Sequence, residues 1–253
     1  MLSSIIQPIE KEITAVNNQI EKHLLIKSGN LKSFAHLEFP PLNKSIRPAL
    51  LILTARLFGC NPEKAVPMGC VIQFIYMASK VHAAISEKDS DYIRGNTDPR
   101  DGSQFPVLVG DYLYGKFFYF LCRDGQLNFL GTLSELVCTI HEGGILSKKS
   151  EGQDPREIIR KETAELFAVS CWLGASLAGA TEREQESMRR FGLNFGMAYG
   201  LLEQGGPAGY VASYCKEALA HLAGIPARAD KSVFEQIVQK LSGSGLAATR
   251  MVI

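Results

Sequence analysis

The sequence predicts an all-α protein, and two kinds of signal carry this prediction. The first is apolar residues at three- and four-residue steps, which is the spacing of a helix with one buried face. It is clearest in one stretch, whose recurring apolar residues are Val71, Phe74, Ile75, Ala78, Val81 and Ile85. The second is helix-start signals such as Asn61-Pro62-Glu63, in which a capping residue precedes a proline and an acid that suit the first turn. We therefore expect a central helix from about residue 62 to beyond residue 85, with other helices packed around it.

Length, charge and cysteine spacing exclude several classes of protein. A chain of 253 residues with 46% hydrophobic residues is long enough to bury a large core. Its 27 Lys and Arg residues balance 26 Asp and Glu residues, so charge indicates neither nucleic acid nor a membrane surface as a partner. The six cysteines include no Cys-x-x-Cys pair, which favours reduced thiols over a metal site or disulfides. Without a signal-peptide pattern or an apolar run near the roughly 20 residues of a membrane span, we expect a cytoplasmic protein with no transmembrane segment.

The first helix is predicted within residues 1–30, where apolar residues from Ile5 to Leu24 alternate with charged ones at helical spacing. Such a helix either packs on the core or docks on a partner. The following segment, PPLNKSIRP, contains three prolines and is predicted to be a loop leading into a helix with Pro48 in its first turn. The loop carries Lys44 and Arg47, whose spacing alone is typical of a solvated basic loop.

A polar connector follows the central helix and leads to two further predicted helices, residues 104–121 and 126–147. Its acids Glu87, Asp89 and Asp91 are spaced two residues apart, which favours a charged helix end over a cation site. The aromatic residues of the first of these helices are expected in the core or in a dimer interface: Tyr112, Phe117, Phe118 and Tyr119.

Two strong start signals organise the second half of the chain. Asp154-Pro155-Arg156-Glu157 opens one long helix, and the capping box Thr181-Glu182-Arg183-Glu184 opens the next, which is expected to reach Gln204. Gly205-Gly206-Pro207 then breaks that helix. Further helices are expected up to about residue 241, followed by a loose tail.

An ordered series of short motifs resembles the trans-isoprenyl (polyprenyl) diphosphate synthase family, and the match is good over roughly residues 40–205. The motifs are Ile46-Arg47-Pro48, Ala78-Ser79 with His82, Arg94-Gly95, Gly110-Asp111-Tyr112-Leu113, Thr163-Ala164 with Leu166-Phe167, and Gly196-Met197-Ala198-Tyr199. The resemblance implies one domain over residues 1–253, built as a bundle of about eight to ten helices around a central cavity and truncated near the C-terminus. Residues 1–38 would be an N-terminal amphipathic helix with its linker, and residues 242–253 a loose tail.

The resemblance also implies a remnant diphosphate site. In the family a Gly-Lys-Arg-x-Arg-Pro segment grips the diphosphate of isopentenyl diphosphate, for which cationic donors at fixed spacing are required. Lys44 and Arg47 match its lysine and second arginine, and Arg94 matches one arginine of a following Arg-Arg-Gly. The family's lysine for the allylic diphosphate is replaced by Glu162, an anion that would repel that substrate.

The two aspartate-rich motifs of the family are largely lost. Ala83, Ala84 and Glu87 stand at the first motif, and Glu203, Gln204 and Pro207 stand at the second. Active members use these aspartates to hold magnesium, which prefers oxygen ligands and neutralises the leaving diphosphate. We therefore expect that this chain has no catalytic residues, no metal site and no cofactor, and that it is inactive by itself.

Three functions remain open. The first, which we favour, is a non-catalytic, regulatory subunit that pairs with an active prenyl diphosphate synthase in isoprenoid biosynthesis. The chain is expected to form either a homodimer or a heterodimer with that synthase. The second is a weakly active prenyltransferase whose altered metal site uses Glu87, Asp91 and Glu203. The third is a homodimer that holds a prenyl chain or another lipid. Isopentenyl diphosphate and a prenyl chain are the candidate ligands, and the charge balance leads us to expect no nucleic-acid partner.

Overall fold

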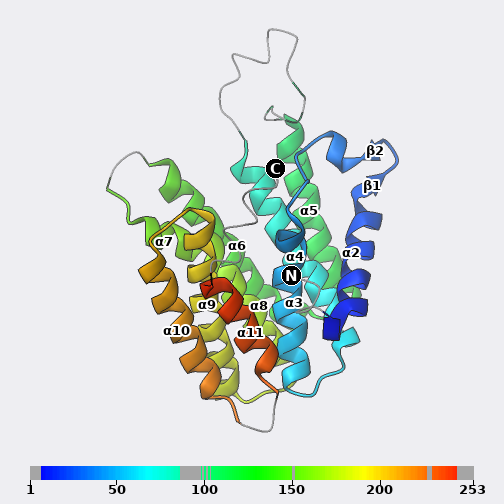
Figure 1. Cartoon of the computed structure of the whole chain (residues 1–253). Coiled ribbons are helices and arrows are strands. Elements are labelled where there is room, and N and C mark those ends of the chain that lie inside the picture. Colours follow the sequence, from blue (N-terminus) through cyan, green and yellow to red (C-terminus); the bar gives the residue numbers. More distant parts are fainter. Residues whose placement is uncertain are drawn as a thin grey trace.

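The computed structural model describes residues 7–85, 98, 100, 102, 104–149, 152–226 and 230–243. This part of the chain is a bundle of helices, with α2 on one side and α10 on the other (Figure 1). The helical elements are η1 (Gln7–Ile9), α2 (Glu10–Leu24), η2 (Leu31–Ser33), α3 (Pro41–Leu57), η3 (Pro62–Ala65), α4 (Val66–Ala83), α5 (Gln104–Arg123), η6 (Leu127–Phe129), α6 (Leu130–Lys148), α7 (Pro155–Ile159), η7 (Arg160–Ala164), α8 (Glu165–Leu177), α9 (Glu182–Glu203), α10 (Ala208–Ala223) and α11 (Ser232–Ser242). The prediction of an all-α fold is confirmed. One short antiparallel ladder, β1 (Leu25–Ile26) with β2 (Gly29–Asn30), accompanies these helices.

Helix α4 is the centre of the bundle, as the sequence predicts. Most of its residues are buried on every side, and it packs against α2, α3, α5 and α6. A helix that is apolar all round is stable only where other elements cover it completely. The central position of α4 therefore follows from its composition.

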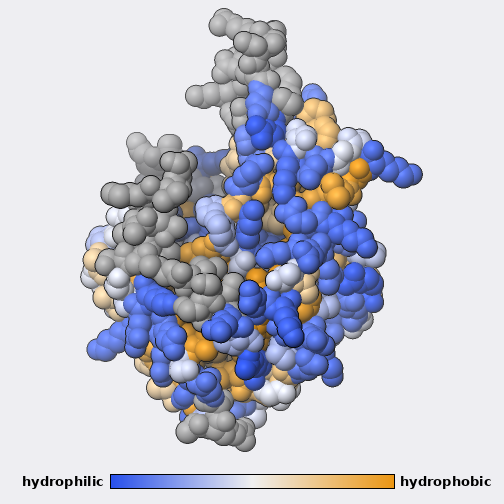
Figure 2. All heavy atoms as spheres, turned by 45° about the vertical axis from the view of Figure 1, so that its right-hand side comes forward, coloured by the Kyte–Doolittle hydropathy of each residue, from blue (hydrophilic) through white to orange (hydrophobic). Residues whose placement is uncertain are grey.

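Helix α2 packs on the core of its own chain. Its buried residues are Ile13, Val16, Ile20 and Leu24, the positions that the helical spacing selects. They lie against α3 and α4, while the outer face of the helix is polar. Figure 2 brings this side of the molecule forward and shows a largely hydrophilic surface with small apolar patches. Of the two roles predicted for the first helix, the structure shows the intramolecular one.

Two predicted boundaries are wrong. The segment predicted to be a loop is the first turns of α3, which begins at Pro41 and contains Pro48 in its interior. Proline at the first helical position costs nothing, because its missing N–H would have no partner there. Helix α4 ends at Ala83 instead of beyond residue 85, and the N–H groups of Ala84 and Ile85 turn back to the carbonyls of Val81 and His82. The apolar periodicity continues through Ile85 and therefore predicted too long a helix. The last turn of a helix often tightens, which shifts the helix end by one or two residues.

The start signals of the second half are confirmed, with one interruption. Asp154 caps α7 through the N–H of Arg156, and Thr181 with Glu184 forms a complete capping box on α9. The long helix opened by Asp154 contains a π-helical turn, η7, between α7 and α8. Helix α9 ends at Glu203, and Gly205 takes a φ of 70° before α10 begins. None of the described helices has the length and apolar character needed to cross a membrane.

Helix α9 approaches its neighbours unusually closely through glycines. A Cβ at Gly192, Gly196 or Gly200 would meet the segment 159–168 at 2.5–2.6 Å, well inside normal contact. These positions are four residues apart and therefore share one face of the helix. At Gly192 and Gly196 the contact atoms include backbone atoms of Phe167 and Ala164.

Candidate functional site

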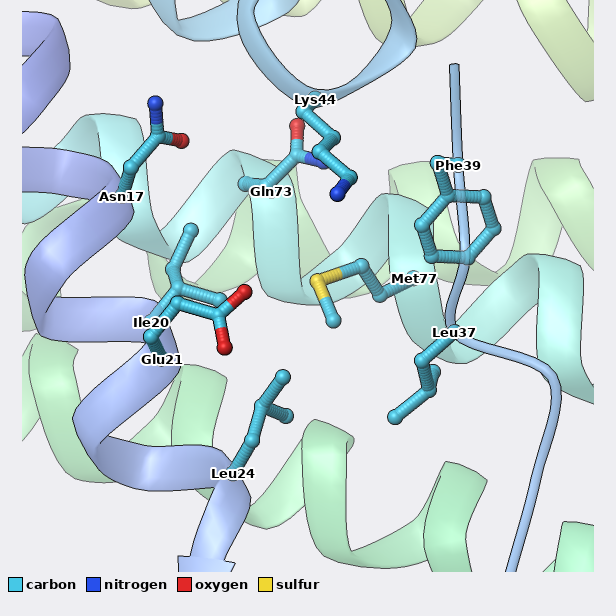
Figure 3. A pocket seen from close by; sticks show the side chains of 9 residues that line it. All are labelled: Asn17, Ile20, Glu21, Leu24, Leu37, Phe39, Lys44, Gln73 and Met77. Atoms are coloured by element: carbon cyan, nitrogen blue, oxygen red, sulfur yellow. The ribbon is translucent and has the colours of Figure 1, made fainter. Parts of the chain in front are cut away.

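A first cavity of about 230 Å³ lies between α2 and α4. Its lining residues are Asn17, Ile20, Glu21, Leu24, Leu37, Phe39, Lys44, Gln73 and Met77. Figure 3 shows Lys44, Gln73 and Asn17 at one end and Leu24 at the other, so the cavity has a polar end and an apolar end. Such a division suits a small ligand with a polar head and an apolar tail.

Lys44, a predicted diphosphate ligand, faces this cavity. Its ammonium makes no hydrogen bond or ion pair with the described residues, whereas the carboxylate of Glu21 binds Lys32 at 2.8 Å. Gln73 is only 2% exposed, and its Nε2 donates to the backbone oxygen of Asn43 at 3.3 Å. Its Oε1 has no partner among the described residues. A buried carbonyl oxygen without a donor is costly and marks a place where a ligand could donate.

Arg47, the second predicted ligand, is buried in the core instead. It is 1% exposed, and its guanidinium lies 3.8 Å from the ring centroid of Tyr76 and 4.6 Å from that of Phe167. Nη1 donates to the backbone oxygen of Asn43 at 3.4 Å, while Nε has no partner in the described part of the chain. Aromatic faces stabilise a desolvated guanidinium by about 2 kcal/mol or more, which offsets part of its burial cost. The structure thus separates the environments of Lys44 and Arg47, although both lie on α3.

A small polar network connects the start of α3 to the end of α9. Asn43 donates from Nδ2 to Glu203 Oε1 at 3.1 Å and accepts at Oδ1 a hydrogen bond from the hydroxyl of Tyr199. Burial raises the pKa of Tyr199, and the nearby Glu203 adds to the effect, so this hydroxyl keeps its proton and donates. Glu203, a predicted motif position, is therefore already engaged by the protein.

A second cavity of about 230 Å³ lies between α4 and α6 and is closed on one side by η7. Its principal polar lining consists of Ser79, Lys80, His82, His141, Lys148 and Glu162. Ala83, the first position of the lost motif, also lines it. Sequence reasoning placed Ala83 and Glu162 together only through the resemblance, and the structure brings them to one cavity.

Lys80 is a site residue that sequence reasoning missed. It makes no hydrogen bond or ion pair with the residues that the structure describes, and its Nζ lies 5.9 Å from the ring centroid of Tyr76. Burial, reinforced by the charge of Arg47, lowers the pKa of the Lys80 ammonium against the opposing influence of Glu203 and Glu162. The available signal was a lysine on the apolar stripe of the central helix, four residues after Tyr76 and three before Ala83.

Two histidines meet beside Lys80. The rings of His82 and His141 are 5.9 Å apart, and His141 Nε2 lies 2.7 Å from the hydroxyl oxygen of Tyr114. His82 Nε2 lies 3.3 Å from the backbone oxygen of Val107. A Cβ on Gly110 would come within 2.1 Å of this nitrogen, so the glycine of the Gly-Asp-Tyr-Leu motif makes room for the imidazole. Glu142, the next residue after His141, binds Lys161 at 2.9 Å instead.

The model of one family, polyprenyl synthetase, matches residues 31–203 of this chain. The chain belongs to the polyprenyl synthetase family. Its relatives include the octaprenyl diphosphate synthase of Escherichia coli K12, which is 31% identical over 169 residues, or 63% of this chain and 52% of that protein. The chain thus spans about half the length of the curated octaprenyl diphosphate synthases it matches.

Solved structures of the family share the fold. A polyprenyl synthase from Caulobacter crescentus CB15, solved with calcium and isoprenyl diphosphate, has a TM-score of 0.74 at 20% identity and covers 96% of each chain. The geranyl diphosphate synthase small subunit from Antirrhinum majus has a TM-score of 0.72 at 17% identity, covering 95% of this chain and 98% of that one. At these identities the likeness establishes the helical architecture alone.

The described motif positions of this chain do not fit magnesium. Ala83 and Ala84 offer no side-chain ligand, Gln204 is the C-cap of α9, and Pro207 is the N-cap of α10. Among the described residues no three His, Cys, Asp or Glu side chains are grouped to hold a metal ion. Magnesium requires several hard oxygen ligands in octahedral geometry. Glu87, Asp91 and Arg94 lie outside the described residues, and their predicted roles stay predictions.

Proposed function

We propose that this chain is a non-catalytic subunit that pairs with an active prenyl diphosphate synthase and modulates its rate or product length. The observation that carries the proposal is the state of the second motif, where the one remaining carboxylate, Glu203, is bound by Asn43. Ionisation of an allylic diphosphate depends on electrostatic stabilisation worth several kcal/mol for each major group. With alanine, glutamine and proline at the other described positions, the described part of this chain lacks the groups that would supply it.

The environment of Arg47 supports the same conclusion. A diphosphate ligand needs a guanidinium that can turn toward it and donate two parallel hydrogen bonds. The Arg47 guanidinium instead lies between Tyr76 and Phe167, with almost no exposed surface. Of the predicted cations on α3, only Lys44 faces a cavity.

Helix α5 supplies a surface for the partner. Phe105, Leu108, Phe118 and Tyr119 are exposed by 38–64%, whereas Phe117 on the same helix is buried. Large apolar side chains that gather on one exposed helix indicate a protein interface. Of the aromatic residues predicted for the core or a dimer interface, Phe117 is buried, whereas Phe118 and Tyr119 are exposed. The likeness to a structure described as a small subunit supports a heteromeric pairing.

The decisive experiment is a prenyl-transfer assay with isopentenyl diphosphate, allylic diphosphates and magnesium. The purified chain is measured alone and mixed with an active synthase from the same source. We expect no product from the chain alone and an altered rate or chain length in the mixture. Product from the chain alone would support the altered metal site that includes Glu87 and Asp91, and would refute the proposal. A purified homodimer that carries lipid and leaves the synthase unchanged would favour the lipid-binding alternative.

A substitution on α5 tests the pairing surface directly. Gly115 has open space where a Cβ would stand, so Gly115→Arg changes the surface without a clash inside the chain. Gly209 on α10 is equally open and provides the matched control Gly209→Arg. We expect Gly115→Arg to weaken co-elution with the synthase and to remove the altered product profile, while Gly209→Arg retains both. Equal behaviour of the two variants would show that α5 is not the interface.

A further inference from the structure

We propose that the first cavity, between α2 and α4, binds a small uncharged amphiphile with a hydroxyl head and a short apolar tail, such as a primary alcohol of about seven carbons. This binding role goes beyond the pairing with a synthase and does not depend on it. Three features of the cavity carry it: the balance of charge in the lining, one buried acceptor at the polar end, and the volume of the apolar part.

The charge of the lining favours an uncharged ligand. Among the described residues that line the cavity, Lys44 is the one cation and Glu21 the one anion. A multivalent anion would be opposed by a single ammonium and repelled by the carboxylate, and an amine would be repelled by the ammonium. Arg47, the next cation on α3, is 1% exposed and does not line this cavity. A ligand without net charge therefore fits the lining best.

The polar end of the cavity offers one acceptor and one donor to the same head group. Gln73 is 2% exposed, and its Nε2 donates to the backbone oxygen of Asn43, which fixes the orientation of the amide. Its Oε1 is buried and has no partner in the described part of the chain. Lys44 lies at the same end and supplies N–H donors alone (Figure 3).

A hydroxyl is the simplest head group that satisfies both residues, because it donates one hydrogen bond and accepts others. It can donate to Gln73 Oε1 while it accepts from the ammonium of Lys44. A carboxylate could accept from Lys44, but it would leave the buried Oε1 without a donor, and an unsatisfied buried acceptor is costly. The chemistry of this end therefore selects an alcohol over an acid.

The rest of the cavity is apolar and suits a short hydrocarbon tail. Leu24 and Leu37 lie at the end opposite the polar one (Figure 3), and Ile20, Phe39 and Met77 complete the apolar lining. At about 30 Å³ for a group the size of a water molecule, the volume of about 230 Å³ holds about seven or eight non-hydrogen atoms. One hydroxyl oxygen and about seven carbons therefore fill the cavity.

The test is a calorimetric titration of the purified chain with primary alcohols from 1-butanol to 1-decanol. Each added methylene should tighten binding about fourfold up to about 1-heptanol, because it buries further apolar surface. 1-Heptanol should bind with a Kd below about 1 mM, and longer alcohols should bind more weakly, since their last carbons cannot enter. Affinity that rises steadily to 1-decanol would indicate partition onto an exposed surface and would overturn the proposal, as would absence of 1-heptanol binding.

Head groups are compared at a constant tail length. 1-Heptanol should bind more tightly than heptanoate and more tightly than heptylamine, because each charged head satisfies just one of the two polar groups. Isopentenyl diphosphate, with and without magnesium, is titrated in the same way. Tighter binding of any of these three charged ligands than of 1-heptanol would overturn the proposal.

Three variants test the lining. Gln73→Met removes the buried acceptor and Lys44→Met removes the donor, and each should weaken 1-heptanol binding about fivefold or more. Lys64→Met is the matched control, because Lys64 is exposed and does not line the cavity. Leu24→Phe fills part of the apolar end and should move the tightest binding to a shorter alcohol. Unchanged 1-heptanol affinity in Lys44→Met, or an unchanged optimum in Leu24→Phe, would overturn the proposal even if Gln73→Met fails to fold.

Discussion

The contact between α3 and α8 gives a prediction whose size follows from the structure. A Cβ added at Gly174 on α8 would lie 2.2 Å from the backbone oxygen of Leu51 and 2.8 Å from Cβ of Thr54, both on α3. Carbon–oxygen contacts normally begin near about 3.3 Å, so Gly174→Ala forces the helices apart by about 1 Å. Overpacking costs about 1–3 kcal/mol, and the upper value applies here because a backbone oxygen cannot rotate away. Alanine is about 1 kcal/mol more favourable than glycine inside a helix, so the free energy of unfolding should fall by about 2 kcal/mol in total.

The matched control is Gly115→Ala, at a helical position with nothing within 4 Å of the new Cβ. Gly115→Ala should raise the free energy of unfolding by about 1 kcal/mol. The effect of the same Gly→Ala substitution should therefore differ by about 3 kcal/mol between the two sites. Equilibrium unfolding in urea measures both variants, provided that the transition is two-state. Equal effects at Gly174 and Gly115 would refute the reasoning that backbone contact, and not propensity, decides the outcome. Since α3 carries Arg47, Gly174→Ala should also loosen its packing on Phe167.

Two other predictions concern single side chains. Burial lowers the pKa of both His23 and His141, with nearby cations adding to the effect at His23 and His82 adding to it at His141. The unfolded chain therefore binds more protons below about pH 6.5, so the free energy of unfolding measured in urea should fall as the pH drops from 7 to 5. The double variant His23→Gln/His141→Gln should flatten this pH dependence. An unchanged pH dependence in the double variant would contradict the assignment. Thr181→Ala should lower the free energy of unfolding by about 1 kcal/mol in the same urea assay, because Glu184 loses its partner in the capping box of α9. A decrease no larger than that caused by an exposed surface substitution would contradict this prediction.

The fold was predictable where its determinants are local. Thr181 with Glu184 and Asp154 with Arg156 fix helix starts through contacts between residues two or three positions apart, and these are visible in the sequence. The start of α3 was not predictable in this way. Its prolines are compatible with both a loop and a first helical turn, and the choice depends on burial of the following residues against the rest of the bundle.

The sequence could select candidate site residues but could not predict their environments. Motif spacing selects Lys44 and Arg47, yet the burial of Arg47 depends on Phe167, which lies 120 positions further along the chain. Lys80 was missed because a search for apolar periodicity gives no weight to a single lysine among apolar residues. Its position beside Arg47 appears only when α3 and α4 are packed together.

The glycine contacts around η7 have a consequence for the rate of ligand binding. Gly196 of α9 meets η7 at Ala164, and a Cβ on Gly143 of α6 would lie 2.7 Å from Glu162 Cγ. Helices in such close contact leave no side-chain layer along which they can slide, so shear motion between them is blocked. The second cavity must then adjust by rotation of side chains such as Lys148, which takes nanoseconds or less, and not by helix movement on microsecond to millisecond timescales. Binding of a small ligand in this cavity should therefore appear as one kinetic phase whose rate rises linearly with ligand concentration.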